Sequence, residues 1–513
     1  MAKHFSKLYA AELLGVDARL IEIETDINVG LHSFTIVGLA DKALSEAKER
    51  VNSALKNIGV KPPARENRKI VINLAPADVK KTGSHYDLSI AVGYLLATEQ
   101  IKTFDAKNKI FVGELSLDGE LRGVGGVLNM AKMARREGFT EIFVPEANAE
   151  EAALISEIRV TPVKNLTQLI RHLEATEIIT EQPYTIPGEE SAGAAVELSE
   201  IKGQSFAKRA LQVAASGGHN MLMTGSPGSG KTMLAQALLS ILPPMTAEES
   251  IEVTQIWSAA GALGERPFLK TRPFRSPHHT ASPVSVIGGG AMPRPGEASL
   301  AHRGVLFLDE FPEFRRDLLE SLRQPLESGS VHIARAKSNL VFPARFMLIA
   351  AMNPCPCGFY RDEEKECKCG AHEVFRYQKK ISGPLLDRID IQIEVPRINL
   401  SELREKKSEK KEDEAVKLKI NRARQIQTER FAGLKQRIFT NAEMSSKQCD
   451  AVISLTPAAE KFMDSFIKKS LLSARGYYRV LKIAQTIADM EESETVNENH
   501  LAEAFGYRIK TED

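Results

Sequence analysis

The stretch that decides the fold is Gly225-Ser226-Pro227-Gly228-Ser229-Gly230-Lys231-Thr232. Its pattern, G-x-x-x-x-G-K-[ST], is that of a nucleotide-phosphate loop. The apolar run 221–223 predicts a strand before it, and residues 233–242 have the periodicity of a helix after it. Glycines let backbone N–H groups turn toward phosphate oxygens at the positive end of that helix. We expect Lys231 to reach the β- and γ-phosphates and Thr232 to place its hydroxyl on Mg²⁺, so the chain is predicted to hydrolyse a nucleotide.

Two further apolar strands end in polar residues suited to the same reaction. Residues 305–308 lead into Asp309 and Glu310, and residues 346–352 lead into Asn353. We expect Asp309 to bind Mg²⁺ and Glu310 to orient the attacking water. An amide at position 353 is suited to hold that water, although Asn before Pro354 is also a common turn residue.

The order of these three elements resembles the AAA+ ATPases. Residues 383–390 match the segment that supplies the arginine finger in that family, which makes Arg388 the finger. A finger acts on a neighbouring subunit, so the resemblance implies a ring, usually hexameric. Residues 473–479 resemble the sensor-2 region, with Arg475 as the best match and Arg479 as the alternative. The competing interpretation of either arginine is a solvated helix residue.

A long insertion ahead of the Asp-Glu strand indicates the branch of the family. Its motifs at 272–280, 288–290 and 293–297, with 301–310, resemble the Mg-chelatase-like ATPases and within them the ComM/YifB family. Residues 328–337 resemble the presensor-1 hairpin, which implies that Arg335 and Lys337 contact DNA. The insertion 265–303 holds six Arg and Lys residues against two Glu, so Arg272 and Arg275 are further DNA candidates. An ordinary solvated loop would show the same excess of positive charge.

Composition is that of a globular protein with two or three domains. The 513 residues include 68 Lys and Arg against 67 Asp and Glu, so global charge predicts no partner. Hydrophobic residues make up 43% and charged residues 26%. No stretch approaches the length of a membrane span and no basic segment leads an apolar run at the N-terminus, so we expect a cytoplasmic protein without a membrane partner.

The chain is expected to divide into three folded parts, all belonging to the α/β class or to its helical appendage. Alternating strand-like and helical runs in the first third predict an α/β sandwich. The expected strands and helices are 20–27, 34–37, 70–74, 110–114 and 141–144, and 42–58, 88–101 and 127–137. The expected parts are a Lon-like N-terminal domain (1–178), a linker (179–196), an AAA+ P-loop core (197–400) with the insertion 265–303 and a cysteine loop (355–369), and a C-terminal helical lid (401–513) carrying sensor 2.

The N-terminal domain resembles the Lon protease fold, which is S5-like, at residues 71–78 and 113–122. This raises the alternative of an ATP-dependent protease with a Ser–Lys dyad. The position that matches the family's lysine is Leu128, and the serine segment is replaced by residues 82–87. Ser84, His85 and Asp87 lie too close in sequence to converge as a triad. We therefore predict a domain that binds or regulates, with Arg68, Lys80 and Lys81 as weak DNA candidates.

The cysteines are concentrated in one short loop. Cys355, Cys357, Cys367 and Cys369 form two C-x-C pairs, and only Cys449 stands apart. In a cytosolic chain, four such thiols favour tetrahedral Zn²⁺ over disulfides, although the spacing departs from the usual C-x₂-C. His372 is an alternative ligand, and four free thiols remain the competing interpretation.

Three classes of function follow from these patterns. The first is a ring-shaped motor that uses ATP, Mg²⁺ and a structural Zn²⁺. The family resemblance implies that it moves single-stranded and branched DNA in branch migration during natural transformation, with a recombinase or other recombination protein as partner. The second is the motor of a metal chelatase, and the third is a chaperone that remodels a protein without DNA.

Overall fold

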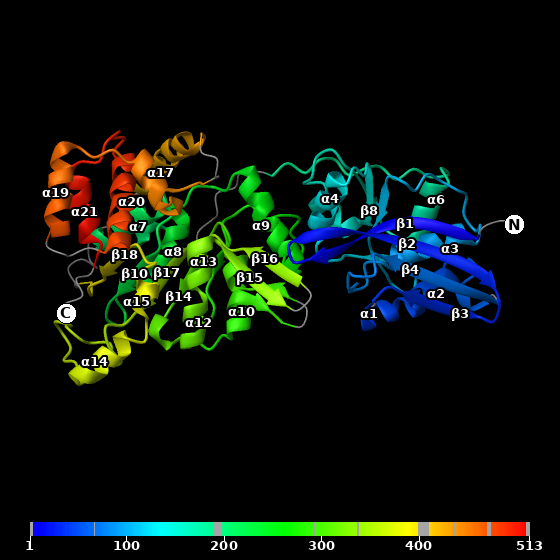
Figure 1. Cartoon of the computed structure of the whole chain (residues 1–513), viewed down its shortest axis with the longest axis horizontal. Coiled ribbons are helices and arrows are strands. Elements are labelled where there is room, and N and C mark those ends of the chain that lie inside the picture. The colour runs from blue at the N-terminus through cyan, green and yellow to red at the C-terminus, as the bar shows by residue number, and fades with distance from the viewer. Residues whose placement is uncertain are drawn as a thin grey trace.

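The computed structural model describes residues 4–39, 41–65, 67–187, 196–290, 293–335, 338–398, 410–433, 438–468 and 473–508. Three folded parts follow one another along the long axis of the molecule (Figure 1). The N-terminal domain lies at one end, the sheet with the phosphate loop lies in the middle, and the C-terminal helices lie at the other end. Among the described residues, no helix combines the length and the apolar character that crossing a membrane requires.

The N-terminal domain is an α/β fold built on two larger sheets and a small sheet of two strands, β6 and β7. A four-stranded sheet has the order β1-β2-β4-β3, and a three-stranded sheet has the order β5-β8-β9. Apolar side chains from the sheets and helices form two large buried clusters. The elements are β1 (Phe5–Leu14), β2 (Asp17–Val29), β3 (Ser33–Val37), α1 (Lys42–Ser45), α2 (Ala47–Asn57), β4 (Arg68–Ala75), α3 (Asp87–Ala97), β5 (Lys109–Phe111), β6 (Glu114–Leu115), β7 (Leu121–Arg122), α4 (Val127–Arg136), β8 (Glu141–Pro145), α5 (Ala149–Ala152), β9 (Arg159–Val163) and α6 (Leu166–Leu173).

This domain differs from the sequence expectation in several elements, and β7, α5 and α6 are among those that were not expected. The single helix expected over 42–58 is two helices, α1 and α2, which meet at Glu46. The strands β1 and β9 were not expected, yet β1 pairs with β2 along its whole length. Buried and exposed residues do not alternate strictly in β1, because Ala10, Ala11 and Glu12 are all buried. The period-2 pattern that predicts a strand is therefore weak there.

The ATPase core is built on a five-stranded parallel sheet. Its strands are β11 (Phe274–Arg275), β14 (Val305–Leu308), β17 (Met347–Met352), β10 (Met221–Thr224) and β18 (Ile391–Glu394), in this spatial order. Helices α7 (Ser205–Gly217), α8 (Lys231–Ile241) and α9 (Ala247–Ala260) precede or follow β10. Because the strands are parallel, the loops that follow β10, β14 and β17 meet at one edge of the sheet.

The insertion and the presensor hairpin are short elements beside this sheet. The insertion contains α10 (Pro283–Ile287), β12 (Gly288–Gly289), β13 (Arg294–Pro295) and α11 (Glu297–Leu300), and the hairpin is β15 (Ser330–Arg335) and β16 (Ser338–Pro343). Between β14 and the hairpin lie α12 (Arg316–Ser321) and α13 (Arg323–Ser328), and the cysteine loop is followed by α14 (Ala371–Gln378) and α15 (Gly383–Leu386). The hairpin β15–β16 packs against the turn between β1 and β2, where a Cβ at Gly15 would lie 3.5 Å from the Phe342 ring. Figure 1 shows the two hairpins side by side.

A second contact joins the N-terminal domain to the core. The Asn129 amide on α4 donates to the backbone carbonyl of Gln255 on α9 (3.2 Å). The Ser258 hydroxyl donates to the buried carboxylate of Glu151. These polar ties, with Phe268 inserted into an apolar cluster of the N-terminal domain, connect that domain to the helix that leads into the insertion.

The C-terminal helices pack directly on the ATPase core. They are α17 (Lys410–Phe431), α18 (Ser446–Val452), α19 (Pro457–Lys468), α20 (Ala474–Met490) and α21 (Glu498–Gly506). One apolar cluster contains Leu211 of α7, Leu238 of α8 and Ile483 of α20, all fully buried. The core and the helices thus share buried surface, which fixes the position of the lid on the sheet.

Candidate ATPase site

The phosphate loop lies between β10 and α8, as the motif predicts. Its conformation needs glycine at two kinds of position. At Gly225 a Cβ would lie 2.3 Å from the Val395 carbonyl, so the strand end can approach only without a side chain. Gly230 has φ of +89° directly before α8, a backbone conformation that L-residues rarely adopt. The backbone of the loop therefore leads directly into the N-terminus of α8, a helix of eleven residues.

Lys231 lies inside the loop. Its Nζ donates to the carbonyl oxygens of Gly225 (2.7 Å) and Ser226 (3.0 Å), and the side chain of Asn353 is 3.4 Å away. Burial lowers the pKa of Lys231, and the charge of Asp309 opposes that shift. The contact with Asn353 places the amide that follows β17 beside the lysine of the phosphate loop. The two side chains therefore belong to one site.

Thr232 and Asp309, the two residues expected to bind Mg²⁺, lie in direct contact. The Thr232 hydroxyl donates to Asp309 Oδ2 at 2.9 Å, which joins the start of α8 to the end of β14. A hydroxyl and a carboxylate are hard oxygen ligands of the kind that Mg²⁺ prefers beside nucleotide phosphates. These two residues therefore fit the ion that the loop chemistry implies.

Glu310 has a partner that the sequence did not indicate. Its carboxylate Oε2 lies 3.2 Å from Nδ1 of His279, a residue of the insertion. Glu310 has φ of +51°, so the backbone turns sharply just after the strand. His279 follows β11, the strand next to β14, so the signal available in the sequence was its position shortly after that edge strand. The insertion thereby touches the residue expected to orient the lytic water.

Arg388 lies at the opposite edge of the sheet from the phosphate loop. Strands β10 and β18 are parallel, with Met221 opposite Ile391, and the backbone N–H of Asp390 donates to Asn220 just before β10. Arg388 therefore lies beside the amino ends of the strands, whereas the phosphate loop follows their carboxyl ends. Its guanidinium pairs with Glu327 and also donates to the Pro384 carbonyl (2.7 Å).

The two sensor-2 candidates lie with Arg388. Arg388 and then Arg475 hold the pKa of Glu327 below its usual value. Arg479 lies 3.5 Å from Asp387, and within the described residues its terminal nitrogens make no hydrogen bond. All three arginines line a cavity of about 600 Å³ between the core and the lid.

That cavity is rich in basic side chains. Its basic lining residues are Arg272, Arg303, Arg345, Arg388, Arg424, Arg475, Arg479 and Lys482. Its acidic lining residues are Glu249, Glu327, Asp387, Asp390 and Glu443. The basic side chains outnumber the acidic ones, so the cavity suits an anion.

The insertion arginines are engaged within the chain. Arg272 pairs with Glu249 through two nitrogens and also donates to the Pro243 carbonyl, and only 13% of its side chain is exposed. Burial acts to raise the pKa of Glu249, but Arg272 outweighs burial and the pKa is lowered. Arg275 pairs in the same way with Glu297. These contacts favour a structural role for both arginines over contact with DNA.

The hairpin candidates can be placed only in part. Arg335 is the last residue of β15, opposite Ser338 of β16, and Lys337 lies outside the described residues. Among the weak candidates of the N-terminal domain, Lys81 is fully buried and donates to the Pro76 carbonyl, so it is inaccessible to DNA. Lys80 beside it is exposed.

The segment 82–87 forms no triad. Ser84 donates to Glu114, and Asp87 binds Arg50, while His85 is buried beside Tyr86. Leu128 is fully buried at the start of α4. The side chains of Ser84, His85 and Asp87 thus have separate partners.

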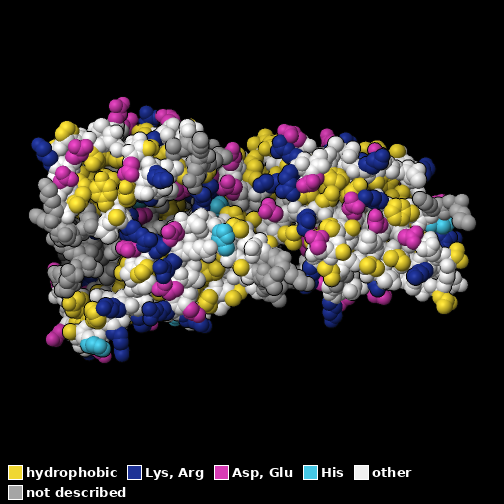
Figure 2. All heavy atoms as spheres, in the orientation of Figure 1, with side chains coloured by type: hydrophobic (Ala, Val, Ile, Leu, Met, Phe, Trp, Pro, Cys, Tyr) yellow, Lys and Arg dark blue, Asp and Glu magenta, His cyan; other side chains and the backbone are white. Residues whose placement is uncertain are grey.

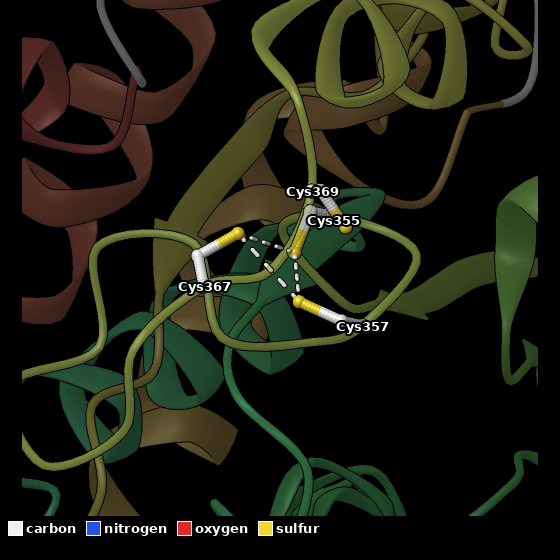
Figure 3. Close-up of side chains that lie close together, drawn as sticks. All are labelled: Cys355, Cys357, Cys367 and Cys369. Carbon is white, nitrogen blue, oxygen red and sulfur yellow. Dashed lines mark hydrogen bonds between the residues drawn. The ribbon is translucent and has the colours of Figure 1, made fainter.

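The four loop cysteines converge (Figure 3). Their sulfur atoms lie within 4.8 Å of one another, with Cys355 3.3 Å from Cys357 and 3.7 Å from Cys367. Zn–S bonds of about 2.3 Å in a tetrahedron put sulfur atoms about 3.8 Å apart. The arrangement fits a Zn²⁺ site, and it is complete without His372, which is exposed on α14.

The parallel sheet, the phosphate loop and its three polar partners define an AAA+ P-loop ATPase. Family models described as magnesium chelatase, subunit ChlI, match residues 197–403 for the ATPase, 23–148 for the N-terminal part and 410–508 for the C-terminal part. The chain is 41% identical to competence protein ComM of Haemophilus influenzae, covering 98% of this chain and 97% of that protein. It is also 41% identical to YifB of Salmonella typhimurium (96% and 95% covered) and 39% identical to YifB of Escherichia coli (98% and 97% covered).

The chain therefore belongs to the Mg-chelatase-like ATPases, in the ComM/YifB family. A partial similarity to the Lon protease of Azorhizobium caulinodans, 26% identity over 35% of the chain and 22% of that protein, agrees with the Lon-like part of the fold.

Proposed function

We propose that the protein is a ring-forming ATPase that couples ATP hydrolysis to movement along DNA. Its similarity to ComM supports branch migration of recombination intermediates in natural transformation, with other recombination proteins as partners. The ATPase class rests on the family, whereas the ring and the DNA substrate are inferred from the arrangement of the charged residues.

The placement of Arg388 carries the proposal of a ring. Strand β10 has four residues, so about 10 Å of strand separates the two sheet edges at about 3.3 Å per residue. An arginine at the amino edge of the sheet cannot reach a phosphate at the carboxyl edge of its own subunit. A basic cavity that contains Arg388, Arg475 and Arg479 is instead suited to the γ-phosphate held by a neighbouring copy. Heterologous contacts of this kind close into rings.

The chemistry within one subunit follows from the residues at the carboxyl edge. Lys231 and the loop N–H groups bind the phosphates, and Thr232 and Asp309 hold Mg²⁺, which neutralises charge on the transferred phosphoryl group. Glu310 and Asn353 position the attacking water. Glu310 must leave His279 to do so, because that imidazole lies on its carboxylate.

The β15–β16 hairpin is the proposed DNA-contacting element. Arg335, the last residue of β15, and Lys337 two residues later in the sequence supply positive charge without any base-reading motif, which suits phosphate contacts. In Figure 2 the basic and acidic side chains are interspersed over the visible face, in line with a formal net charge of +1. The general surface therefore indicates no DNA-binding site, and a locally basic element is the better candidate.

We also propose that Cys355, Cys357, Cys367 and Cys369 hold one structural Zn²⁺. The sulfur spacing supports this assignment, and so does the absence, among the described residues near these sulfurs, of an open-site His/Glu set. Four thiolates with no open coordination position are typical of structural rather than catalytic zinc.

The second candidate function is a motor that remodels a protein, including the motor subunit of a metal chelatase. The description of the matching family models favours it. Intramolecular pairing of Arg272 and Arg275, which removes two basic side chains from the DNA-binding candidates, also favours it.

ATP hydrolysis by the full-length protein separates the two candidates. The rate is measured without DNA and with single strands, duplex and a synthetic four-way junction, and Lys231→Ala serves as the blank. Stimulation that is strongest on branched DNA is expected for the DNA motor. Robust hydrolysis that ignores every DNA would reject it and favour a protein partner.

A further inference from the structure

The cysteine loop lies against the phosphate loop. Gly358, between the two cysteine pairs, has φ of +87°, and a Cβ there would lie 2.6 Å from two carbon atoms of the Pro227 ring. Cys355, two residues after Asn353, is fully buried. The cysteine loop is therefore packed against the phosphate loop. In the sequence it begins immediately after Asn353, the residue proposed to position water.

The same two loops also bring polar side chains together. Ser226 of the phosphate loop is the main cause that holds the pKa of Asp362 below its usual value, and the Asp362 side chain is only 3% exposed. Ser226 also accepts from Lys231 through its backbone carbonyl (3.0 Å). Ser226 thus lies between the cysteine loop and the lysine expected to bind the β- and γ-phosphates.

Arg397, just after β18, completes the support. Its guanidinium lies 3.7 Å from Asp362 and donates to Glu364 (2.9 Å), and it stacks on Phe359 with 5.7 Å to the ring centroid. The cysteine loop is thereby held from three sides: by its sulfur cluster, by Arg397 and by the phosphate loop.

We propose that Zn²⁺ on the four cysteines stiffens this loop so that it braces the phosphate loop, and that zinc occupancy therefore sets the affinity for nucleotide. This inference rests on the proposed zinc site. Closing a loop with a metal removes conformational freedom that the loop would otherwise lose when the nucleotide binds. A phosphate cradle that is ordered in advance binds more tightly, because less ordering accompanies binding.

The test measures nucleotide binding rather than hydrolysis. The metal content of the purified full-length protein is determined by mass spectrometry, and the Kd of a fluorescent ADP analogue is measured before chelation, after chelation and after zinc is restored. We expect one zinc per chain and a Kd that rises about tenfold on chelation, equivalent to about 1.4 kcal/mol. Restored zinc should return the original Kd.

A substitution identifies the route of the effect. Asp362→Ala removes the carboxylate that lies beside Ser226 and Arg397, and it should raise the Kd about threefold in the zinc-loaded protein, an effect of the size of one polar contact. In chelated protein the same substitution should have no further effect, because the loop has already lost its position. The exposed neighbour Glu363 provides the matched control, Glu363→Ala, which should leave the Kd unchanged in both forms.

The possible outcomes separate the two claims. Protein without zinc, whose Kd is also indifferent to added zinc, would refute the zinc site itself. Stoichiometric zinc whose removal leaves the Kd unchanged would keep the site and overturn the brace. If chelation lowers the melting temperature of the whole protein, zinc-loaded Asp362→Ala decides instead, and a Kd equal to that of the unaltered protein rejects the inference. None of these readouts depends on DNA.

Discussion

The contact between His279 and Glu310 predicts a restraint on basal hydrolysis. The imidazole and the carboxylate are 3.2 Å apart, and their side chains are 33% and 56% exposed. A pair exposed to this extent contributes about 1 kcal/mol at most. Since about 1.4 kcal/mol is a tenfold change in rate, freeing Glu310 is worth up to about fivefold. His279→Ala should therefore raise DNA-free turnover by up to that factor.

The assay is phosphate release by full-length protein at saturating ATP, with and without branched DNA. The rate with DNA should change by less than about twofold, because the active arrangement already lacks the contact. His278→Ala is the matched control, since Nδ1 of His278 contacts Thr280 and its ring stacks on His279 (centroids 4.1 Å apart) without touching Glu310. An unchanged DNA-free rate would refute the restraint, and a lowered rate would show that His279 assists Glu310.

Three further substitutions test other parts of the site and fold. Glu310→Gln should bind ATP and abolish turnover, and rapid hydrolysis in this variant would remove Glu310 from its role. Arg272→Ala should destabilise the core by about 3 kcal/mol in chemical unfolding, because it leaves a buried carboxylate unpaired; a loss of DNA affinity at unchanged stability would contradict this. Burial raises the pKa of Glu12 to about 7, so folding should lose stability as pH rises from about 4.5 to 7. The free energy of unfolding of Glu12→Gln, taken relative to the unaltered protein, should thus rise by up to about 3 kcal/mol across that interval. A difference in melting temperature that does not depend on pH would refute the pKa shift.

Local motifs made the phosphate site predictable. The loop, Asp309, Glu310 and Asn353 each follow a strand that ends at the same sheet edge, and the parallel order brings them together. Lys231 lies 3.4 Å from Asn353 although they are 122 residues apart in sequence. Such convergence follows from the shared direction of the parallel strands. In the sequence, an apolar run followed by a polar residue marks the end of each strand.

The other parts of the site depend on tertiary packing. The roles of Arg388 and Arg475 were predicted from the family resemblance. That both line one cavity depends on how the lid packs through α20 onto α7. The contacts of His279 and Asp362 arise where loops cross, and no periodicity marks such crossings. Arg272 was predicted as a DNA candidate because charge patterning cannot show that a glutamate 23 residues earlier lies opposite it.

The opposed positions of Lys231 and Arg388 give a quantitative test of the ring. A subunit with Arg388→Ala keeps its phosphate loop, and one with Lys231→Ala keeps its finger, so each variant alone should be inactive. In randomly mixed rings with equal amounts, a site works when the first kind supplies the loop and the second kind supplies the finger, which holds for about one quarter of interfaces. The mixture should therefore recover up to about one quarter of the unmutated rate, and dilution that disassembles the ring should abolish it. If subunit exchange is demonstrated with differently labelled chains and the mixture stays inactive, Arg388 does not act on the neighbouring subunit.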